Sequence, residues 1–168
     1  MPGKSFAHNV IVANIVGELG QRLASLPCAV LPSDMRVHVK VTGLYTYPDA
    51  AVVCGELSFL HKEFDTLLNP TLIVEVLSPS TEAYDRGRKF DHYAWIETVA
   101  QYLLVASDCV HADLYTRQPG GSWLRTSANS PQDAIELQSI GCRLTLANLY
   151  EKVEFGGPPT ASPGAPAA

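Results

Sequence analysis

The sequence predicts an α/β fold, of mixed α+β character, in which a central mixed sheet is flanked by helices and the C-terminal half is β-rich. Three observations carry this prediction. Apolar residues recur at helical spacing from residue 8 to 26, as in an amphipathic helix. Segments 72–77 and 101–106 are apolar along nearly their whole length, as in strands covered on both faces. Further short segments of strand character follow from residue 112 onward.

The first predicted helix buries one apolar stripe and ends near Pro27. The stripe consists of residues at helical spacing: Ile11, Ile15, Leu19 and Leu23. His8 lies one turn earlier and extends this stripe toward the start of the helix. Judged by position alone, His8 is interpreted as a core or capping histidine.

Two strands and a loop are predicted before the long apolar strand. Residues 34–41 alternate between polar and apolar side chains, and residues 47–54 form a second strand that Pro48 opens. Residues 55–69 mix charges with scattered apolar residues, so we expect an exposed loop. The strand at 72–77 follows.

A second helix is expected after the Ser-Pro-Ser-Thr segment at 78–81, which offers N-caps. It starts at residue 82 or 85 and ends near 96, with Gly87 lowering its stability by about 1 kcal/mol relative to alanine. Asp85, Lys89 and Tyr93 share one face of this helix, and Tyr93 is interpreted as core. The remaining elements are a strand, a hairpin around two glycines, a strand and a closing helical turn: 101–106, 112–126, 142–146 and 146–153.

The composition indicates one globular domain without a membrane span. The chain has 168 residues, and residues 1–155 suit a single domain, whereas 156–168 are rich in Gly, Pro and Ala and are expected to be a disordered tail. A net charge of -5 argues against binding nucleic acid by charge alone. The four cysteines are widely spaced, which indicates neither a zinc site nor a disulfide framework and fits a cytoplasmic protein.

Glu75 is the most informative residue, because it interrupts an otherwise apolar strand. An unpaired carboxylate there would lose roughly several kcal/mol through desolvation. Glu75 therefore needs a partner, which is either a basic side chain from the segment 85–89 or a metal ion.

A second acid, Asp49, begins the strand at 47–54. If this strand neighbours the one that carries Glu75, both carboxylates meet at one end of the sheet. With the Val76 carbonyl they form half a shell for Mg²⁺, which prefers oxygen ligands. A lysine on the following helix would then stabilise a metal-activated hydroxide, which is a recipe for phosphodiester hydrolysis.

At these residues the sequence resembles the Uma-two family of endonucleases, within the restriction-endonuclease-like PD-(D/E)XK superfamily. The resemblance covers residues 5–153 and rests on the first helix with His8, on Tyr93 and on five segments: 33–37, 47–53, 70–81, 85–89 and 101–105. It implies a restriction-endonuclease-like core, a nucleic-acid substrate with DNA favoured over RNA, and Mg²⁺ or Mn²⁺ as cofactor. It also implies that Asp49 and Glu75 bind the metal and that Lys89 is the catalytic lysine. His8, Asp34 and Asp85 are candidate supporting residues, and Arg86, Arg88 and His92 are candidate phosphate contacts.

One position departs from the superfamily pattern. The lysine normally follows the second acid by two residues, and Leu77 stands there in this chain. The resemblance implies that the lysine has moved to the helix, at Lys89.

Three alternatives stay open. Glu75 can form a structural ion pair with Arg86, Arg88 or Lys89, in which case the chain would be an inactive nucleic-acid-binding or assembly module. Lys89 and Asp85 can be a solvated pair worth about 0.3–0.5 kcal/mol. Exposed apolar surface in the C-terminal half can form a homodimer under either interpretation.

Overall fold

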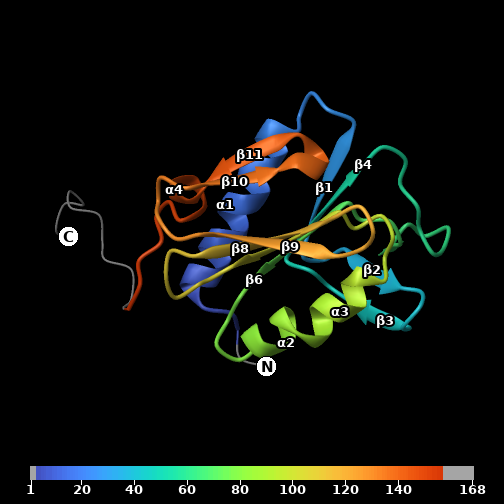
Figure 1. Cartoon of the computed structure of the whole chain (residues 1–168), viewed down its shortest axis with the longest axis horizontal. Coiled ribbons are helices and arrows are strands. Elements are labelled where there is room, and N and C mark those ends of the chain that lie inside the picture. The colour runs from blue at the N-terminus through green and yellow to red at the C-terminus, as the bar shows by residue number, and fades with distance from the viewer. Residues whose placement is uncertain (1–2, 157–168) are drawn as a thin grey trace, which may run out of the picture.

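A computed structural model describes residues 3–156 and contains a six-stranded mixed sheet with packing on both faces (Figure 1). The sheet has the order β1-β4-β6-β7-β8-β9. Strands β6 and β7 are parallel, and the other neighbouring pairs are antiparallel. The strands are β1 (Cys28–Pro32), β4 (Ala50–Cys54), β6 (Leu72–Val76), β7 (Gln101–Val105), β8 (Ala112–Arg117) and β9 (Trp123–Ala128). The predicted α/β class with a central mixed sheet is confirmed.

Two separate apolar clusters form the core, one on each face of the sheet. One face is covered by α1 (Phe6–Arg22), the hairpin β10 (Ala134–Leu137) and β11 (Cys142–Thr145), the 3-10 turn η1 (Gln138–Ile140) and α4 (Leu146–Leu149). The other face is covered by α2 (Glu82–Arg86), α3 (Arg88–Ala94) and a small sheet of β3 (Leu44–Thr46), β2 (Arg36–Val39) and β5 (Thr66–Leu67).

The alternation of side chains along β6 determines which face Glu75 approaches. Leu72, Val74 and Val76 belong to the cluster under α1. Ile73 and Leu77 belong to the opposite cluster, which includes Tyr93 of α3. Because successive side chains in a strand point to opposite faces, Glu75 extends toward α3.

Four strands were not expected from the sequence: β1, β3, β5 and β10. β3 and β5 have only three and two residues. β1 and β5 pair with strands distant in sequence, whereas β3 and β10 form hairpins with β2 and β11. Residues 55–69 illustrate the correction, because Thr66 and Leu67 of β5 are buried and pair with β2, although the whole segment was expected to be exposed. A two-residue strand carries no readable periodicity.

The second predicted helix is two helices, broken at Gly87. This residue has φ -106° and ψ -99°, outside the helical region, and a Cβ there would lie 3.2 Å from the carbonyl oxygen of Ala83. The break therefore favours glycine and turns α3 relative to α2. The first helix also ends earlier than expected, at Arg22, and begins with the Ser5 side chain accepting the His8 backbone N–H.

A disulfide joins Cys28 of β1 to Cys54 of β4, so the expectation of no disulfide is wrong for this pair. The residues face each other across antiparallel strands with their Cα atoms 4.0 Å apart. Because β1 was not predicted, nothing in the sequence indicated this proximity. Cys109 and Cys142 are free.

Reduction of this disulfide is expected to lower the free energy of unfolding by about 3 kcal/mol, because the bond closes a loop with a sequence separation of 26 residues. Urea denaturation with and without reductant measures the difference. The double variant Cys28→Ser, Cys54→Ser should show one midpoint in both conditions. Equal midpoints for the oxidised and reduced wild type would contradict the expectation.

No helix within residues 3–156 is both long enough and apolar enough to cross a bilayer. The predicted tail at 156–168 lies, apart from Gly156, outside the described residues. The division into a domain at 1–155 and a tail stays a prediction.

Candidate active site

Asp49 and Glu75 lie beside each other on neighbouring strands. The register pairs Ala50 of β4 with Val74 of β6, so one step further along the antiparallel pair places Asp49 opposite Glu75. Oδ2 of Asp49 accepts the backbone N–H of Val76 at 2.7 Å. Asp49 is thus anchored to the strand that carries Glu75.

Lys89 forms an ion pair with Glu75. Its Nζ lies 2.5 Å from Oε1 of Glu75, and the hydroxyl of Tyr93 donates to the same oxygen at 3.0 Å. Lys89 and Tyr93 are one turn apart on α3, so both side chains face β6. The side chains of Lys89 and Glu75 are only 10% and 4% exposed, which makes this a buried pair.

Asp85 adds a third carboxylate to the group, and this one is buried. Its Oδ1 lies 3.5 Å from Nζ of Lys89, and its side chain is 5% exposed. The hydroxyl of Tyr102, on β7, donates to the backbone carbonyl of Asp85 at 2.9 Å and fastens α2 to the sheet. The Asp85–Lys89 pair is therefore buried within the site and is not a solvated helix pair.

The charges in this group do not balance. Burial raises the pKa of Glu75 to about 8; Lys89 lowers it, whereas Asp49 and Asp85 raise it. Burial would lower the pKa of Lys89, but the carboxylates around it, Glu75 first, outweigh burial and raise it. One lysine faces three acids, so the site favours binding another proton or cation.

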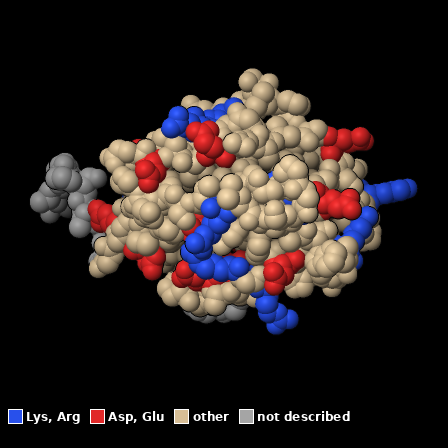
Figure 2. Space-filling model, viewed as in Figure 1, with Lys and Arg blue, Asp and Glu red and all other residues tan. Residues whose placement is uncertain are grey.

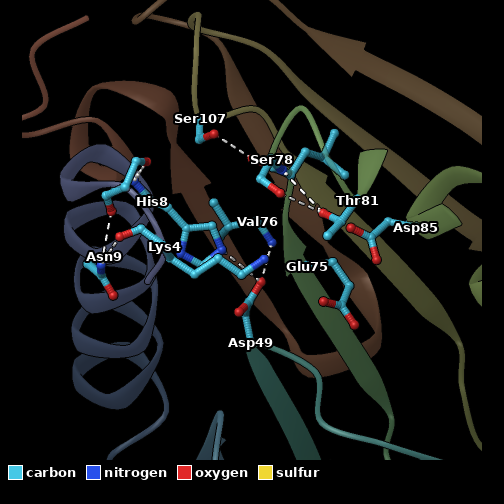
Figure 3. A network of polar contacts seen from close by, with 12 residues as sticks. Lys4, His8, Asn9, Asp49, Glu75, Val76, Ser78, Thr81, Asp85 and Ser107 are labelled. Atoms are coloured by element: carbon cyan, nitrogen blue, oxygen red, sulfur yellow. Dashed lines mark hydrogen bonds and ion pairs between the residues drawn. The ribbon is translucent and has the colours of Figure 1, made fainter. Parts of the chain in front are cut away.

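His8 approaches the same group from α1, on the other face of the sheet. Its Nε2 lies 3.5 Å from Oδ2 of Asp49, and the side chain is 4% exposed. Neither ring nitrogen has a hydrogen-bond partner within residues 3–156. Figure 3 shows His8, Asp49, Glu75 and Asp85 arranged around one region at the ends of the strands.

The other predicted site residues lie apart from this group. Asp34 is exposed in the turn before β2, and Arg88 is exposed at the start of α3. Nη1 of Arg86 lies 2.7 Å from Oδ2 of the buried Asp113 on β8, and its Nε lies 2.9 Å from Glu82. His92 contacts Thr42 through Nδ1 at 2.8 Å.

Sequence reasoning missed two parts of the site. Tyr93 was interpreted as core, which its complete burial confirms; what the interpretation missed is that its hydroxyl donates to Glu75. Ser78 and Thr81, in the loop after β6, join their hydroxyls at 2.9 Å and lie near Glu75 and Asp85 (Figure 3). The sequence indicated these hydroxyls as helix N-caps and as part of the segment 70–81 that carries the family resemblance, yet Thr81 makes no side-chain cap bond.

No three His, Cys, Asp or Glu side chains in the described part of the chain stand close enough to hold a metal ion as they are placed. The contacts of Asp49 use Oδ2, and those of Glu75 use Oε1. The remaining oxygen of each carboxylate has no described hydrogen bond. The metal set of Asp49, Glu75 and the Val76 carbonyl stays a prediction.

A comparison with known protein families identifies the family to which the chain belongs. Residues 1–147 match the family described as "Uma2: Putative restriction endonuclease". The chain belongs to the Uma2 family. The expected resemblance is thereby confirmed, and the Uma2 match includes every residue of the site.

Two curated relatives of this Uma2 chain come from the cyanobacterium Synechocystis. The "uncharacterized protein slr1290" is 38% identical over 155 residues, covering 92% of this chain and 80% of the relative. The "uncharacterized protein sll1609" is 31% identical over 134 residues, covering 80% and 76%. A solved structure from Anabaena variabilis, described as a "putative nuclease belonging to DUF820", has a TM-score of 0.71 at 16% identity and covers 89% of this chain and 83% of its own. At this identity the structural likeness shows the fold.

Proposed function

We propose that this chain is a divalent-metal-dependent endonuclease that hydrolyses phosphodiester bonds in nucleic acid, with DNA as the favoured substrate. The observation that carries the proposal is the group of three carboxylates, the buried Glu75 and Asp85 and the half-buried Asp49, around the single amino group of Lys89. A purely structural ion pair needs one acid. The excess of acid suits a site that accepts a cation.

The donor chemistry of these residues suits a hard divalent ion, although no three His, Cys, Asp or Glu side chains within residues 3–156 stand close enough to hold one as they are placed. Asp49 and Glu75 would hold Mg²⁺ or Mn²⁺ together with the Val76 carbonyl, because such ions take oxygen ligands and keep several waters. When bound, the ion lowers the pKa of a water molecule and offsets charge on the phosphate. The orphaned nitrogens of His8 are a further sign that the space beside Asp49 accepts a ligand.

The chain's own residues have distinct roles in this proposal. Lys89 keeps its proton beside Glu75 and stabilises negative charge that develops on the reacting phosphate. Tyr93 holds Oε1 of Glu75 and orients its second oxygen. Asp85 positions Lys89 from the preceding turn.

Phosphate binding must be local. On the face seen in Figure 2 the basic side chains are few and stand among acidic ones. Arg86 is occupied by Asp113 and Glu82, whereas Arg88 is exposed and has no described ion pair. Arg88 is therefore the better candidate to contact the substrate backbone, and affinity should fall only gradually with salt, because few phosphates are neutralised.

A cleavage assay tests the proposal. DNA and RNA substrates are incubated with Mg²⁺ or Mn²⁺, with chelator as the blank. Asp49→Asn is expected to lower the rate at least about 100-fold, because it removes a charged ligand without changing shape. Asp91→Asn, an exposed change on α3, is the matched control. Equal rates for wild type, Asp49→Asn and the chelator blank would end the nuclease proposal.

A second candidate function, a non-catalytic nucleic-acid-binding or assembly module, is favoured by the direct contact between Lys89 and Glu75. This ion pair already neutralises Glu75, so a metal is not needed for folding. Calorimetric titration with Mn²⁺ separates the two candidates. Binding that disappears in both Asp49→Asn and Glu75→Gln supports the nuclease, and absence of such binding supports the module.

A further inference from the structure

We infer that a cleft at the C-terminal end of α3 binds a nucleobase, so that the substrate of the proposed nuclease is single-stranded or locally unpaired nucleic acid. The cleft has a volume of about 310 Å³ and lies between the end of α3 and the small sheet of β2, β3 and β5. Trp95 lines it from the end of α3, and His38 and Lys40 line it from β2 and the residue after β2. The inference deepens the proposed function and rests on it for the nucleic-acid partner.

The indole of Trp95 has no structural role that accounts for its position. It is 60% exposed, and no ring stack or cation–π contact involves it within residues 3–156. Trp123, by contrast, packs against Phe90 and lies under the guanidinium of Arg117. A singly exposed apolar side chain on a flat surface needs no explanation, but an indole on the wall of a cleft offers a ring face to a ligand.

The lining of the cleft matches the parts of a nucleotide. Leu68 and Ile96 add apolar side chains to the indole, and Lys40 and Glu97 add one charge of each sign. A base stacks on an aromatic face, a phosphate pairs with a cation, and a carboxylate accepts the exocyclic amino group of a base. Cytosine, adenine and guanine carry this amino group and thymine does not. Thymine is therefore the least favoured base.

Two walls of the cleft are held in place before a ligand arrives. The ring of His38 stacks on Tyr45 with centroids 4.1 Å apart, and its Nδ1 donates to the carbonyl of Leu44 at 3.1 Å, because a carbonyl can only accept. Both amide groups of Asn69 bond to the backbone of residues 56–58, at 2.8 and 2.9 Å. Side chains that are already ordered lose little conformational entropy on binding.

Helix α3 connects the cleft to the candidate active site. Lys89 lies in its first turn and Trp95 follows its last residue, which places them about 9 Å apart along the helix axis. The β2–β3 turn is tied to the same helix, because Thr42 contacts Nδ1 of His92 at 2.8 Å. Figure 1 shows α3 beside β2 and β3. At a rise of roughly 3.4 Å per stacked nucleotide, a strand with a phosphate at Lys89 reaches the cleft two or three nucleotides further on.

Only an unpaired base can enter such a cleft. In a duplex, neighbouring pairs cover the faces of each base and the opposite strand occupies its pairing edge, so a base must leave the stack to lie on Trp95. A second copy of this chain fits less well. A stable interface buries about 800 Å² of each partner and its core is depleted in charge, whereas this cleft is small and includes Lys40 and Glu97.

The test measures binding of short labelled oligonucleotides by fluorescence anisotropy, in chelator, so that metal-dependent cleavage does not interfere. Wild type is expected to bind single-stranded oligo-dC at least about tenfold more tightly than the matching duplex. Trp95→Ala should weaken single-strand binding at least about fivefold, Trp95→Phe should recover most of the loss, and duplex binding should not change. Glu97→Ala should remove the preference for oligo-dC over oligo-dT.

Phe155→Ala is the matched control. Phe155 is also an exposed aromatic residue, and it stacks on Tyr150, which belongs to the apolar cluster on the other face of the sheet. This variant should bind every oligonucleotide within about twofold of wild type.

The outcomes separate this inference from the proposed function. Equal single-strand affinity for wild type and Trp95→Ala, or tighter binding of duplex than of single strands, would overturn the nucleobase subsite even if the protein cleaves DNA. A dimer that Trp95→Ala converts to monomer in light scattering, with oligonucleotide affinity unchanged, would assign the cleft to a second copy instead. Single-strand binding that depends on Trp95, without cleavage after Mn²⁺ is added, would support the subsite and contradict the nuclease.

Discussion

Glu75→Gln is expected to make the metal-free protein more stable than wild type at pH 8.5 but not at pH 5. Burial raises the pKa of Glu75 from 4.5 to about 8 in the folded state. Between these values the folded protein binds the proton more tightly than the unfolded chain does. The stability that Glu75 contributes is fully present below pH 4.5, falls as the pH rises toward 8, and is level above it. Glutamine at this position does not titrate.

The size of the stability difference between wild type and Glu75→Gln follows from the same shift in the pKa of Glu75. A rise from 4.5 to about 8 corresponds to at most about 5 kcal/mol of stability lost by wild type relative to Glu75→Gln. Urea denaturation of both proteins at intervals from pH 5 to 9 measures it. Subtracting the two curves of unfolding free energy against pH cancels the contributions of titrating groups that both proteins share. Asp113 is one of these: burial raises the pKa of its carboxyl, but hydrogen bonds from Ser127, Arg86 and His111 lower the pKa by more.

Glu63→Gln is the matched control for this comparison, because Glu63 is exposed in the loop before β5. Its difference from wild type should be flat with pH. A flat difference for Glu75→Gln as well would contradict the expectation and would mean that Lys89 keeps Glu75 ionised throughout this range.

Lys89→Met is expected to lower the rate of metal-dependent cleavage by about 100-fold to 10,000-fold, as for loss of a positioned catalytic group. Methionine keeps much of the length and apolar contact of the lysine stem and removes its charge. The change leaves Glu75 and Asp85 without the amino group they share. Single-turnover rates at saturating Mn²⁺ separate this loss from weaker metal binding.

Two controls make the result for Lys89→Met interpretable. Lys62→Met makes the same chemical change at an exposed loop position and should leave the rate within about twofold of wild type. Folding of Lys89→Met is best checked at pH 6, where Glu75 is mostly protonated and removal of its partner costs least. A folded Lys89→Met protein that cleaves at wild-type rate would exclude Lys89 from the chemistry and make the pair structural.

Much of the site was readable in the linear chain. An acid in the middle of an apolar strand is too costly to leave unpaired, so Glu75 had to have a partner before any contact was known. The placement of Asp49 at the start of the preceding strand predicted that the two carboxylates meet, and the register of β4 and β6 brings them together. The four-residue spacing predicted Asp85 and Lys89 on one face of a single helix; the two side chains do meet, but across the break at Gly87, one from α2 and the other from α3.

Long-range packing determined the choice among equivalent partners. Arg86 and Lys89 are both basic and only three residues apart, yet Arg86 pairs with Asp113 and Lys89 with Glu75. The break at Gly87 separates the two helical segments, and β8, which supplies Asp113, lies two strands away from β6. Charge and spacing alone do not encode which of the two cations reaches which acid.

The same distinction explains the disulfide and His8. Patterns of apolar residues and the desolvation of a single carboxylate depend on only a few neighbouring residues. The sequence alone therefore predicted the sheet, its helices and the pair of acids. Cys28 meets Cys54 through β1, a strand that the sequence did not predict, and His8 is buried without a hydrogen-bond partner within residues 3–156 because α1 packs against the sheet. These features arise from the meeting of distant segments, and the folded chain alone brings those segments together.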